Sequence, residues 1–191
     1  MIAIAWRRAK VILLISLLMC VVFLCNLLLD GLLNQYGVRP RQTDSLGYIY
    51  TMPFLHGSLS HLLNNLAGFL IFGWLCVLRP IGLFYLASFV IISLGGFFVW
   101  MFGRDAIHIG ASGWIFGLWS LNIAFAWFDR KLLNIVIAVG VMFLYGGMIY
   151  GVLPQGGNVS FESHLAGFFA GIVAAWVCST RLGVRISRSK K

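Results

Sequence analysis

Charged residues are scarce in this chain, and acidic residues are the scarcest. Only 10% of the 191 residues are charged and five are acidic, whereas 61% of the chain is hydrophobic. A soluble domain of this size has too little interior to bury so much apolar surface. The composition therefore excludes a soluble globular protein and indicates a polytopic membrane protein.

Cysteine is also sparse, and its placement excludes two kinds of site. The four cysteines are irregularly spaced within hydrophobic segments, where cysteine behaves as a small buried hydrophobe. They are Cys20, Cys25, Cys76 and Cys178. This pattern is typical neither of a disulfide framework nor of a zinc site, and we expect no metal and no cofactor.

Six hydrophobic runs make up most of the chain, each close to the length that crosses a bilayer core. They cover residues 11–29, 58–78, 80–102, 112–128, 132–152 and 163–180. We find no soluble domain, linker or internal repeat beside them. The sequence therefore predicts one membrane domain over residues 1–191, an all-α bundle of six transmembrane helices.

The net charge of +9 comes from basic residues at the ends of these runs. That placement indicates membrane topology rather than a groove for phosphates, so we expect no nucleic-acid partner. With six spans both termini share one side, which holds 11 of the 14 Lys and Arg residues. An excess of basic residues marks the cytoplasmic side, so both termini are expected in the cytoplasm. Small size and the lack of an organelle-targeting segment favour a bacterial inner membrane. The sequence implies no particular oligomeric state.

A serine between glycines opens the fourth and shortest run. Glycines would let a substrate backbone approach the Ser112 hydroxyl. A helix start also offers free backbone N–H groups and a positive dipole end, which favour an oxyanion beside Ser112. Because the run is short, we expect its helix to begin below the outer surface, beside a water-filled pocket. The alternative is a small-residue patch where membrane helices pack.

Polar residues share one face of the second run. His61 and Asn65 are four residues apart and therefore lie on the same side of a helix. An imidazole and a side-chain amide on one face are good donors to a developing oxyanion. The alternative is hydrogen bonding between helices that only holds the bundle together.

The sixth run carries a histidine above a stripe of small residues. Gly167 and Gly171 are four apart, which permits very close packing on a neighbouring helix. If that neighbour carries Ser112, His164 can reach the serine hydroxyl and act as its general base. No Asp or Glu lies inside a hydrophobic run, and Glu162 is the only acid near His164. A Ser–His dyad is therefore favoured over a triad, although a structural histidine is the alternative.

Three spaced motifs thus follow one another along the chain. They are His56-x4-His61-x3-Asn65, Gly110-Ala111-Ser112-Gly113 and Ser163-His164-Leu165-Ala166-Gly167-x3-Gly171. In this order on six helices they resemble the rhomboid family of intramembrane serine proteases, and the resemblance spans nearly the whole chain. It implies hydrolysis of peptide bonds in or near transmembrane segments, with membrane-protein substrates in a lipid bilayer.

The resemblance also implies a role for each motif residue. Ser112 would be the nucleophile and His164 the general base. His61, Asn65 and the Ser112 backbone N–H would form the oxyanion hole. The supporting residues would be His56, Gly110, Gly113, Phe116, Gly167 and Gly171.

Three departures from the family pattern are visible. Phe116 stands where the family often has a tyrosine, which keeps a ring for stacking but loses the hydroxyl. Ser163 stands where many members of the family have an alanine before the histidine. Because serine is also small, we expect this difference to leave activity intact. The first loop carries Gly47-Tyr48-Ile49-Tyr50 instead of a Trp-Arg pair, which affects the details of that loop rather than the chemistry.

Two other functions stay open. A non-enzymatic relative would bind membrane helices, and its binding would not respond to Ser112→Ala. A small transporter or channel would use His56, His61 and His164 for protons or metal, although no Cys or carboxylate joins them and Asn65 is a poor zinc ligand.

Overall fold

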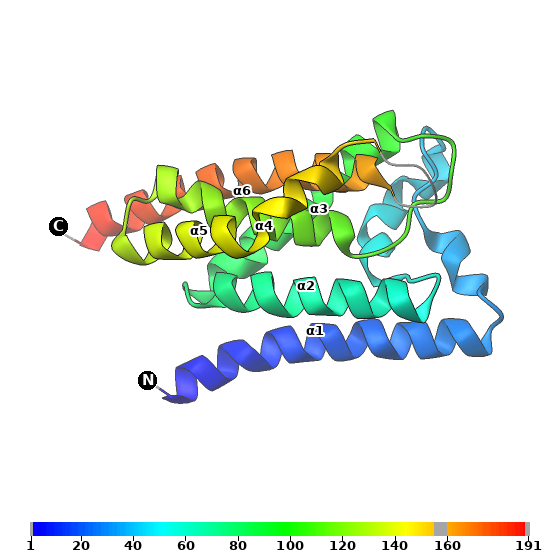
Figure 1. Cartoon of the computed structure of the whole chain (residues 1–191), viewed down its shortest axis with the longest axis horizontal. Helices are drawn as coiled ribbons and strands as arrows, with labels where there is room; N and C mark the ends of the chain where they lie inside the picture. Colours follow the sequence, from blue (N-terminus) through cyan, green and yellow to red (C-terminus); the bar gives the residue numbers. More distant parts are fainter. Residues whose placement is uncertain (1, 155–159, 190–191) are drawn as a thin grey trace.

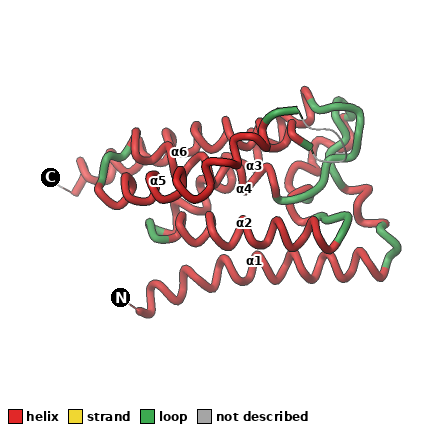
Figure 2. Tube along the Cα trace, viewed as in Figure 1, coloured by secondary structure: helices red, strands yellow, loops and turns green. Residues whose placement is uncertain are grey.

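The six α-helices of the described chain lie roughly along one common axis, and the connection between the first two contains three 3-10 helices (Figure 1). The computed structural model describes residues 2–154 and 160–189. Within those residues all regular structure is helical, apart from one isolated β-bridge between Val38 and His108 (Figure 2). This confirms the all-α class.

Each hydrophobic run corresponds to one α-helix. The α-helices are α1 (Ile2–Leu28), α2 (Leu59–Val77), α3 (Ile81–Phe102), α4 (Ser112–Phe128), α5 (Leu132–Tyr145) and α6 (Phe161–Ser189). The 3-10 helices are η1 (Leu32–Tyr36), η2 (Thr43–Tyr50), η3 (Met52–Phe54) and η4 (Gly146–Val152). Five segments of the described chain are long and apolar enough to cross a membrane, one of them formed by α5 together with η4. The 17-residue α4 is not one of these five segments.

The short helix α4 lies at the centre of the bundle. Every residue from 113 to 122 is buried, and the most extensive helix–helix contact in the protein joins α4 to α6. Helices α2, α3 and α5 cover its remaining sides, while α1 packs outside against α2 (Figure 1). A residue at the start of α4 is therefore held by the rest of the bundle.

The start of α1 and the end of α6 lie at the same end of the bundle (Figure 1). The first loop, with η1 to η3, lies at the opposite end, together with the loop that leads into α4. A chain that enters and leaves at one end crosses the membrane an even number of times.

A buried polar network joins three helices near the end of the bundle that holds the termini. Arg79 is 5% exposed and donates from Nε to Asn134 Oδ1 at 2.9 Å and from Nη1 to Asn122 Oδ1 at 2.7 Å. Its guanidinium also lies 4.4 Å from the ring centre of Phe125. Asn122 in turn donates to the carbonyl of Phe72, 3.2 Å away. Because a cation inside a membrane protein needs polar partners, this network fixes α2, α4 and α5 to one another.

Candidate active site

Ser112 is the first residue of α4, at the end of a loop that turns sharply. Gly110 has φ of 110°, a backbone conformation that favours glycine, and its N–H donates to the Met52 carbonyl at 2.9 Å. Ser112 is half-buried between the buried residues Ala111 and Gly113. The first N–H groups of a helix have no partner within it, so the serine hydroxyl stands beside free backbone donors.

Glycines bring the backbones of α4 and α6 into direct contact. A Cβ on Gly167 would overlap the Gly113 carbonyl, and a Cβ on Gly171 would overlap the Gly117 carbonyl. The Ser120 hydroxyl adds a hydrogen bond to the Phe168 carbonyl at 2.7 Å. The neighbour of the glycine stripe on α6 is therefore the helix that begins with Ser112, an identity that the small-residue spacing alone left open.

His164 lies in the first turn of α6 and is oriented from two sides. Its Nδ1–H donates to the Gly151 carbonyl at 2.9 Å, because a carbonyl can only accept. Its ring stacks on Phe116, with 4.2 Å between ring centres and 8° between planes. The ring stacking expected of Phe116 is thus present, and Nε2 is left without a proton. Within the described chain no hydrogen bond joins His164 to Ser112, and catalytic hydrogen bonds often tighten only when substrate binds.

Close approach at Gly151 makes the orientation of His164 possible. A Cβ there would stand 2.6 Å from Phe116 Cζ and 3.6 Å from His164 Nδ1. Gly140, Gly146 and Gly147, in contrast, have open space at the Cβ position. Of these four glycines of the α5–η4 segment, only Gly151 is packed against the stacked pair.

The polar face of α2 points at the loop before Ser112. A Cβ on Gly110 would lie 2.5 Å from His61 Nε2 and 3.4 Å from Asn65 Nδ2. Asn65 is buried, and its Nδ2 has no hydrogen-bond partner within the described chain. The structure thus gathers His61 and Asn65 beside the Ser112 loop with a donor that is still unused.

His56 supports the same corner from the loop before α2. Its ring lies 5.0 Å from the ring of His61, edge to face, and its Nδ1–H donates to the Phe54 carbonyl at 3.3 Å. Burial lowers the pKa of His56 to about 4, so the ring is neutral at pH 7. Ser58 caps α2 by accepting from the His61 N–H at 3.1 Å. These contacts fix where the polar face of α2 begins.

The Glu162 carboxylate is directed to Arg104 rather than to the His164 ring. It forms an ion pair with Arg104 at 3.5 Å, and the Gly151 carbonyl occupies the place that an acid would take behind the histidine. No cluster of three or more His, Cys, Asp or Glu residues suited to a metal ion occurs among the residues that the structure describes.

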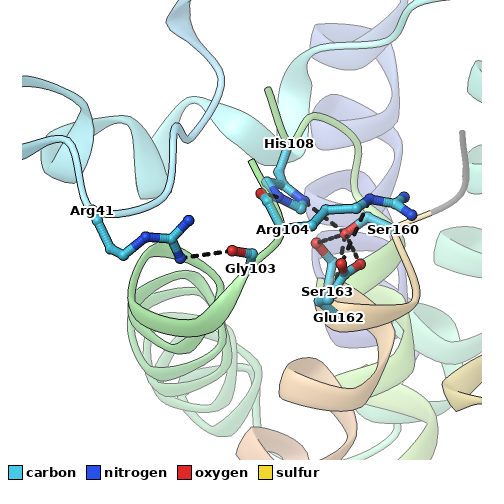
Figure 3. Close-up of polar contacts among 7 residues, drawn as sticks. All are labelled: Arg41, Gly103, Arg104, His108, Ser160, Glu162 and Ser163. Carbon is cyan, nitrogen blue, oxygen red and sulfur yellow. Dashed lines mark hydrogen bonds and ion pairs between the residues drawn. The ribbon is translucent and has the colours of Figure 1, made fainter. Parts of the chain in front are cut away.

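A second polar cluster lies beside this site and could not be found from the sequence motifs. It contains Arg104, His108, Ser160, Glu162 and Ser163, which connect the loop before α4 to the start of α6 (Figure 3). Ser163, which the sequence suggests is merely small enough to fit, has its hydroxyl 2.8 Å from that of Ser160. The members lie far apart in the sequence, and only the fold brings them together.

Comparison with known proteins gives a consistent result. The family model described as Rhomboid domain matches residues 43–181. An uncharacterized protein of Mycobacterium tuberculosis is 38% identical over 171 residues, covering 85% of this chain and 71% of that protein. An uncharacterized protein of Mycobacterium leprae is 34% identical over 156 residues, covering 77% and 62%. Rhomboid-like protein 11, chloroplastic, of Arabidopsis thaliana is 32% identical over 145 residues, covering 68% and 51%.

Proposed function

Since the chain belongs to the rhomboid family of intramembrane proteases, and is an integral membrane protein, we propose that it is an active serine endopeptidase. It hydrolyses peptide bonds in or near transmembrane segments of membrane-protein substrates. Ser112 is the nucleophile and His164 the general base of a Ser–His dyad.

The first half of the reaction makes an acyl-enzyme. The Ser112 hydroxyl attacks the scissile carbonyl carbon while His164 Nε2 takes its proton. When the tetrahedral intermediate collapses, the C–N bond breaks and His164 returns that proton to the leaving amine. In the second half His164 deprotonates a water, which attacks the ester carbon; the C–O bond to Ser112 then breaks, His164 returns the proton to the Ser112 oxygen, and the substrate is left with a new carboxyl end.

The negative charge on the carbonyl oxygen needs donors that are already in place. The Ser112 backbone N–H, His61 and Asn65 Nδ2 supply them in this proposal. The unpartnered, buried Nδ2 supports this role for Asn65, because a buried donor without a partner costs free energy that an arriving oxyanion would recover.

The orientation of His164 is the observation that carries the proposal. The Gly151 carbonyl fixes Nδ1 as the protonated nitrogen, so Nε2 is the free acceptor that a general base requires. Phe116 holds the plane of the ring. A buried structural histidine would also need a hydrogen-bond partner for its ring, so the feature that supports a general base is that Nε2 is left free to accept a proton.

The test is cleavage of a one-span substrate in detergent by Ser112→Ala and His164→Ala. Each change should reduce turnover to background, and the double variant should lose no more, because the two residues act as one unit. Ser179→Ala is the matched control, since within the described residues that hydroxyl donates to the Trp176 carbonyl of its own helix at 2.8 Å. Substantial turnover by Ser112→Ala would refute the proposal. Substrate binding without cleavage by the wild-type protein would favour the non-enzymatic binder.

Substrates should carry helix-weakening residues near the cut. A peptide bond inside a helix hides its carbonyl in an i to i−4 hydrogen bond, and unfolding it in hydrocarbon is costly. The entrance is proposed to pass α5, whose Phe143 side chain is 86% exposed and whose Gly140 has no close neighbour. Replacing Gly or Pro near the cut by Leu should slow cleavage. Equal rates for both substrates would show that local unfolding does not control selection.

The protein is proposed to be a single membrane domain with both termini in the cytoplasm. The common end at which α1 begins and α6 ends supports an even number of crossings, and the basic residues near the termini support the orientation. The mycobacterial relatives support a bacterial inner membrane. A cysteine introduced ahead of the first membrane span, which begins at Arg8, should react with a permeant thiol reagent and not with an impermeant one in intact cells. Labelling of that cysteine by both reagents would contradict the proposed orientation.

A further inference from the structure

Two residues occupy matching positions before the two proposed catalytic groups. His108 lies four residues before Ser112, and Ser160 lies four residues before His164. Although they are 52 residues apart in the chain, His108 Nδ1 and Ser160 Oγ are 2.7 Å apart (Figure 3). His108 is 2% exposed. This contact therefore joins, inside the protein, the loop that ends at Ser112 to the helix that carries His164.

The partners of His108 determine which way the hydrogen bond runs. Its Nε2 lies 3.1 Å from the Arg104 carbonyl, which can only accept, so Nε2 carries the proton. Nδ1 is then an acceptor and receives the Ser160 hydroxyl proton. Burial lowers the pKa of His108, which favours this neutral tautomer at pH 7.

Ser160 connects that bond to the start of α6. Its oxygen accepts from the Ser163 N–H at 3.2 Å, which makes Ser160 the N-cap of α6. The Ser163 hydroxyl lies 2.8 Å away and donates to the same oxygen. The Ser160 proton has a second acceptor in Glu162 Oε2, but at the longer distance of 3.4 Å.

Both ends of this chain of hydrogen bonds are anchored near the proposed catalytic residues. The His108 N–H donates to the Val38 carbonyl at 2.8 Å, and the Val38 N–H donates back at 3.0 Å. At the other end, a Cβ on Gly113 would lie 2.9 Å from the Ser163 carbonyl. Ser163 precedes His164 and Gly113 follows Ser112. A shift of Ser163 would therefore change the distance between the hydroxyl and the imidazole.

We propose that His108, Ser160 and Ser163 form a hydrogen-bonded clamp that sets the spacing between Ser112 and His164, with His108 and Ser160 as positioning residues. The inference rests on the proposed protease function. Neither residue touches the reacting atoms. Their effect is on the geometry in which Nε2 of His164 meets the serine hydroxyl.

The clamp also predicts a response to acid. The groups that face His108 are the Arg104 guanidinium from its own loop, and Ser160 and the Glu162 carboxylate from α6, while Arg41 donates to the nearby Gly103 carbonyl at 2.8 Å. Protonated His108 would donate from Nδ1 to Ser160. The Ser160 hydroxyl would then donate to Glu162 instead of His108. Ser160 Oγ would accept from His108 in addition to the N–H and the hydroxyl of Ser163, so the three donors would compete for it. Acidification below the pKa of His108 should therefore loosen the hold on Ser163.

Two substitutions at His108 separate the clamp from simple packing. In His108→Asn the amide oxygen lies where Nδ1 was and can accept from Ser160, whereas His108→Gln reaches toward Arg104 and offers Ser160 no acceptor there. We expect kcat within about threefold of wild type for His108→Asn and about 10- to 100-fold lower for His108→Gln, because a displacement of about 1 Å has that order of effect. KM should stay unchanged in both.

Ser160 gives a matched series from the other side. Ser160→Thr keeps the cap and the hydroxyl proton and should keep kcat. Ser160→Asp keeps the cap but has no proton to give at neutral pH, and it should lower kcat by the same factor as His108→Gln. The double variant of His108→Gln with Ser160→Asp should lose no more than either alone, because both break one contact.

The experiment measures kcat and KM between pH 5 and 8 for these variants, with wild type and Ser112→Ala beside them. Because burial lowers the pKa of His108, any loss of kcat that comes from its protonation should appear at the acidic end of this range and be absent in His108→Asn. If Ser112→Ala cleaves like wild type, the protease proposal fails, and the clamp with it. If Ser112→Ala is inactive but His108→Gln equals His108→Asn, the clamp alone is refuted.

Discussion

Helix α4 carries a polar network at each end, and the two networks differ in how completely their hydrogen bonds are made. At the Arg79 end, Asn122 and Asn134 accept from the guanidinium, and both amides donate to backbone carbonyls. Only Nη2 of Arg79 lacks a partner within the described chain. At the Ser112 end, Asn65 Nδ2 and His56 Nε2 are both buried without a partner in that part of the chain, and Ser112 is half-exposed.

This difference separates stability from chemistry. A network whose groups already bond one another fixes helices in place, and a ligand has nothing to add to it. A network with an unused donor, here Asn65 Nδ2, costs stability until an acceptor arrives, whereas His56 Nε2 is an unused acceptor because its ring proton is on Nδ1. We infer that the Arg79 network holds the bundle together, while the Ser112 network is prepared for a substrate oxygen.

The largest expected effect comes from separating α4 from α6, because this disturbs the frame of both networks. In Gly167→Ala the new Cβ would meet the Gly113 carbonyl, so the helices must move apart and His164 must leave Ser112. We expect the rate to fall by more than about 100-fold, together with a lower midpoint of thermal unfolding. Gly140→Ala is the control, since its Cβ would enter open space. Equal activity in the two variants would show that the glycine contact does not position the base.

Asn65→Ala tests the Ser112 network alone. If its Nδ2 binds the oxyanion, kcat should fall by about 10²–10³-fold, although His61 can reduce the loss by sharing the charge. Unfolding should change little, because the lost donor has no partner in the described chain. The measurement is kcat and KM on one substrate beside a thermal melt, and a change confined to KM would assign Asn65 to binding.

Asn122→Ala is the counterpart in the Arg79 network. It removes the 2.7 Å bond from Arg79 Nη1, and a hydrogen bond to a charged group contributes about 1.5–3 kcal/mol. We expect that loss in the free energy of unfolding, measured in detergent, with kcat/KM of the folded fraction unchanged. A large fall in kcat at full stability would remove the distinction between the two networks.

The smallest effect concerns His56 and pH. Burial lowers its pKa from 6.5 to about 4 in the folded protein, so between these values the unfolded chain binds a proton that the folded chain does not. Stability is then complete above pH 6.5 and declines as the pH falls toward 4. At pH 5.5 the part of the decline that comes from His56, relative to pH 8, should be about 1.4 kcal/mol, and His56→Gln should lack that part, while a smaller decline remains because burial also lowers the pKa of His108. An identical pH dependence in both proteins would show that His56 is not the group responsible.

Sequence patterns predict the helices and the family because both depend on the spacing of residues over short stretches of the chain. Apolar runs of membrane-spanning length correspond to the six helices, and the spacing of Gly167 and Gly171 is sufficient to indicate close contact with a neighbouring helix. The catalytic roles of Ser112 and His164 stay predictions, with a geometry that supports them. The helices, the family and the candidate catalytic residues can therefore be predicted from side-chain types at fixed separations in the sequence.

The remaining features depend on contacts that no local pattern encodes. The acceptor behind His164 is the carbonyl of Gly151, and every residue has such a carbonyl. His108 and Ser160 meet only because the loop before α4 folds back over the start of α6. Two signals in the sequence point this way without being decisive. They are a histidine outside the family motifs, and a serine three residues before Ser163, in the position of a helix cap.

The carbonyl behind His164 has a consequence for genetics. A side-chain orienting group can be deleted by one codon change, whereas a main-chain oxygen survives every substitution at position 151. Alleles there act only by bulk, since a Cβ would press on Phe116 at 2.6 Å. A screen for inactive alleles in which side chains are shortened should therefore identify Ser112 and His164. It should miss the Gly151 carbonyl, because that group belongs to the main chain. At position 151 the severity of an allele should follow the size of the new residue and not its charge.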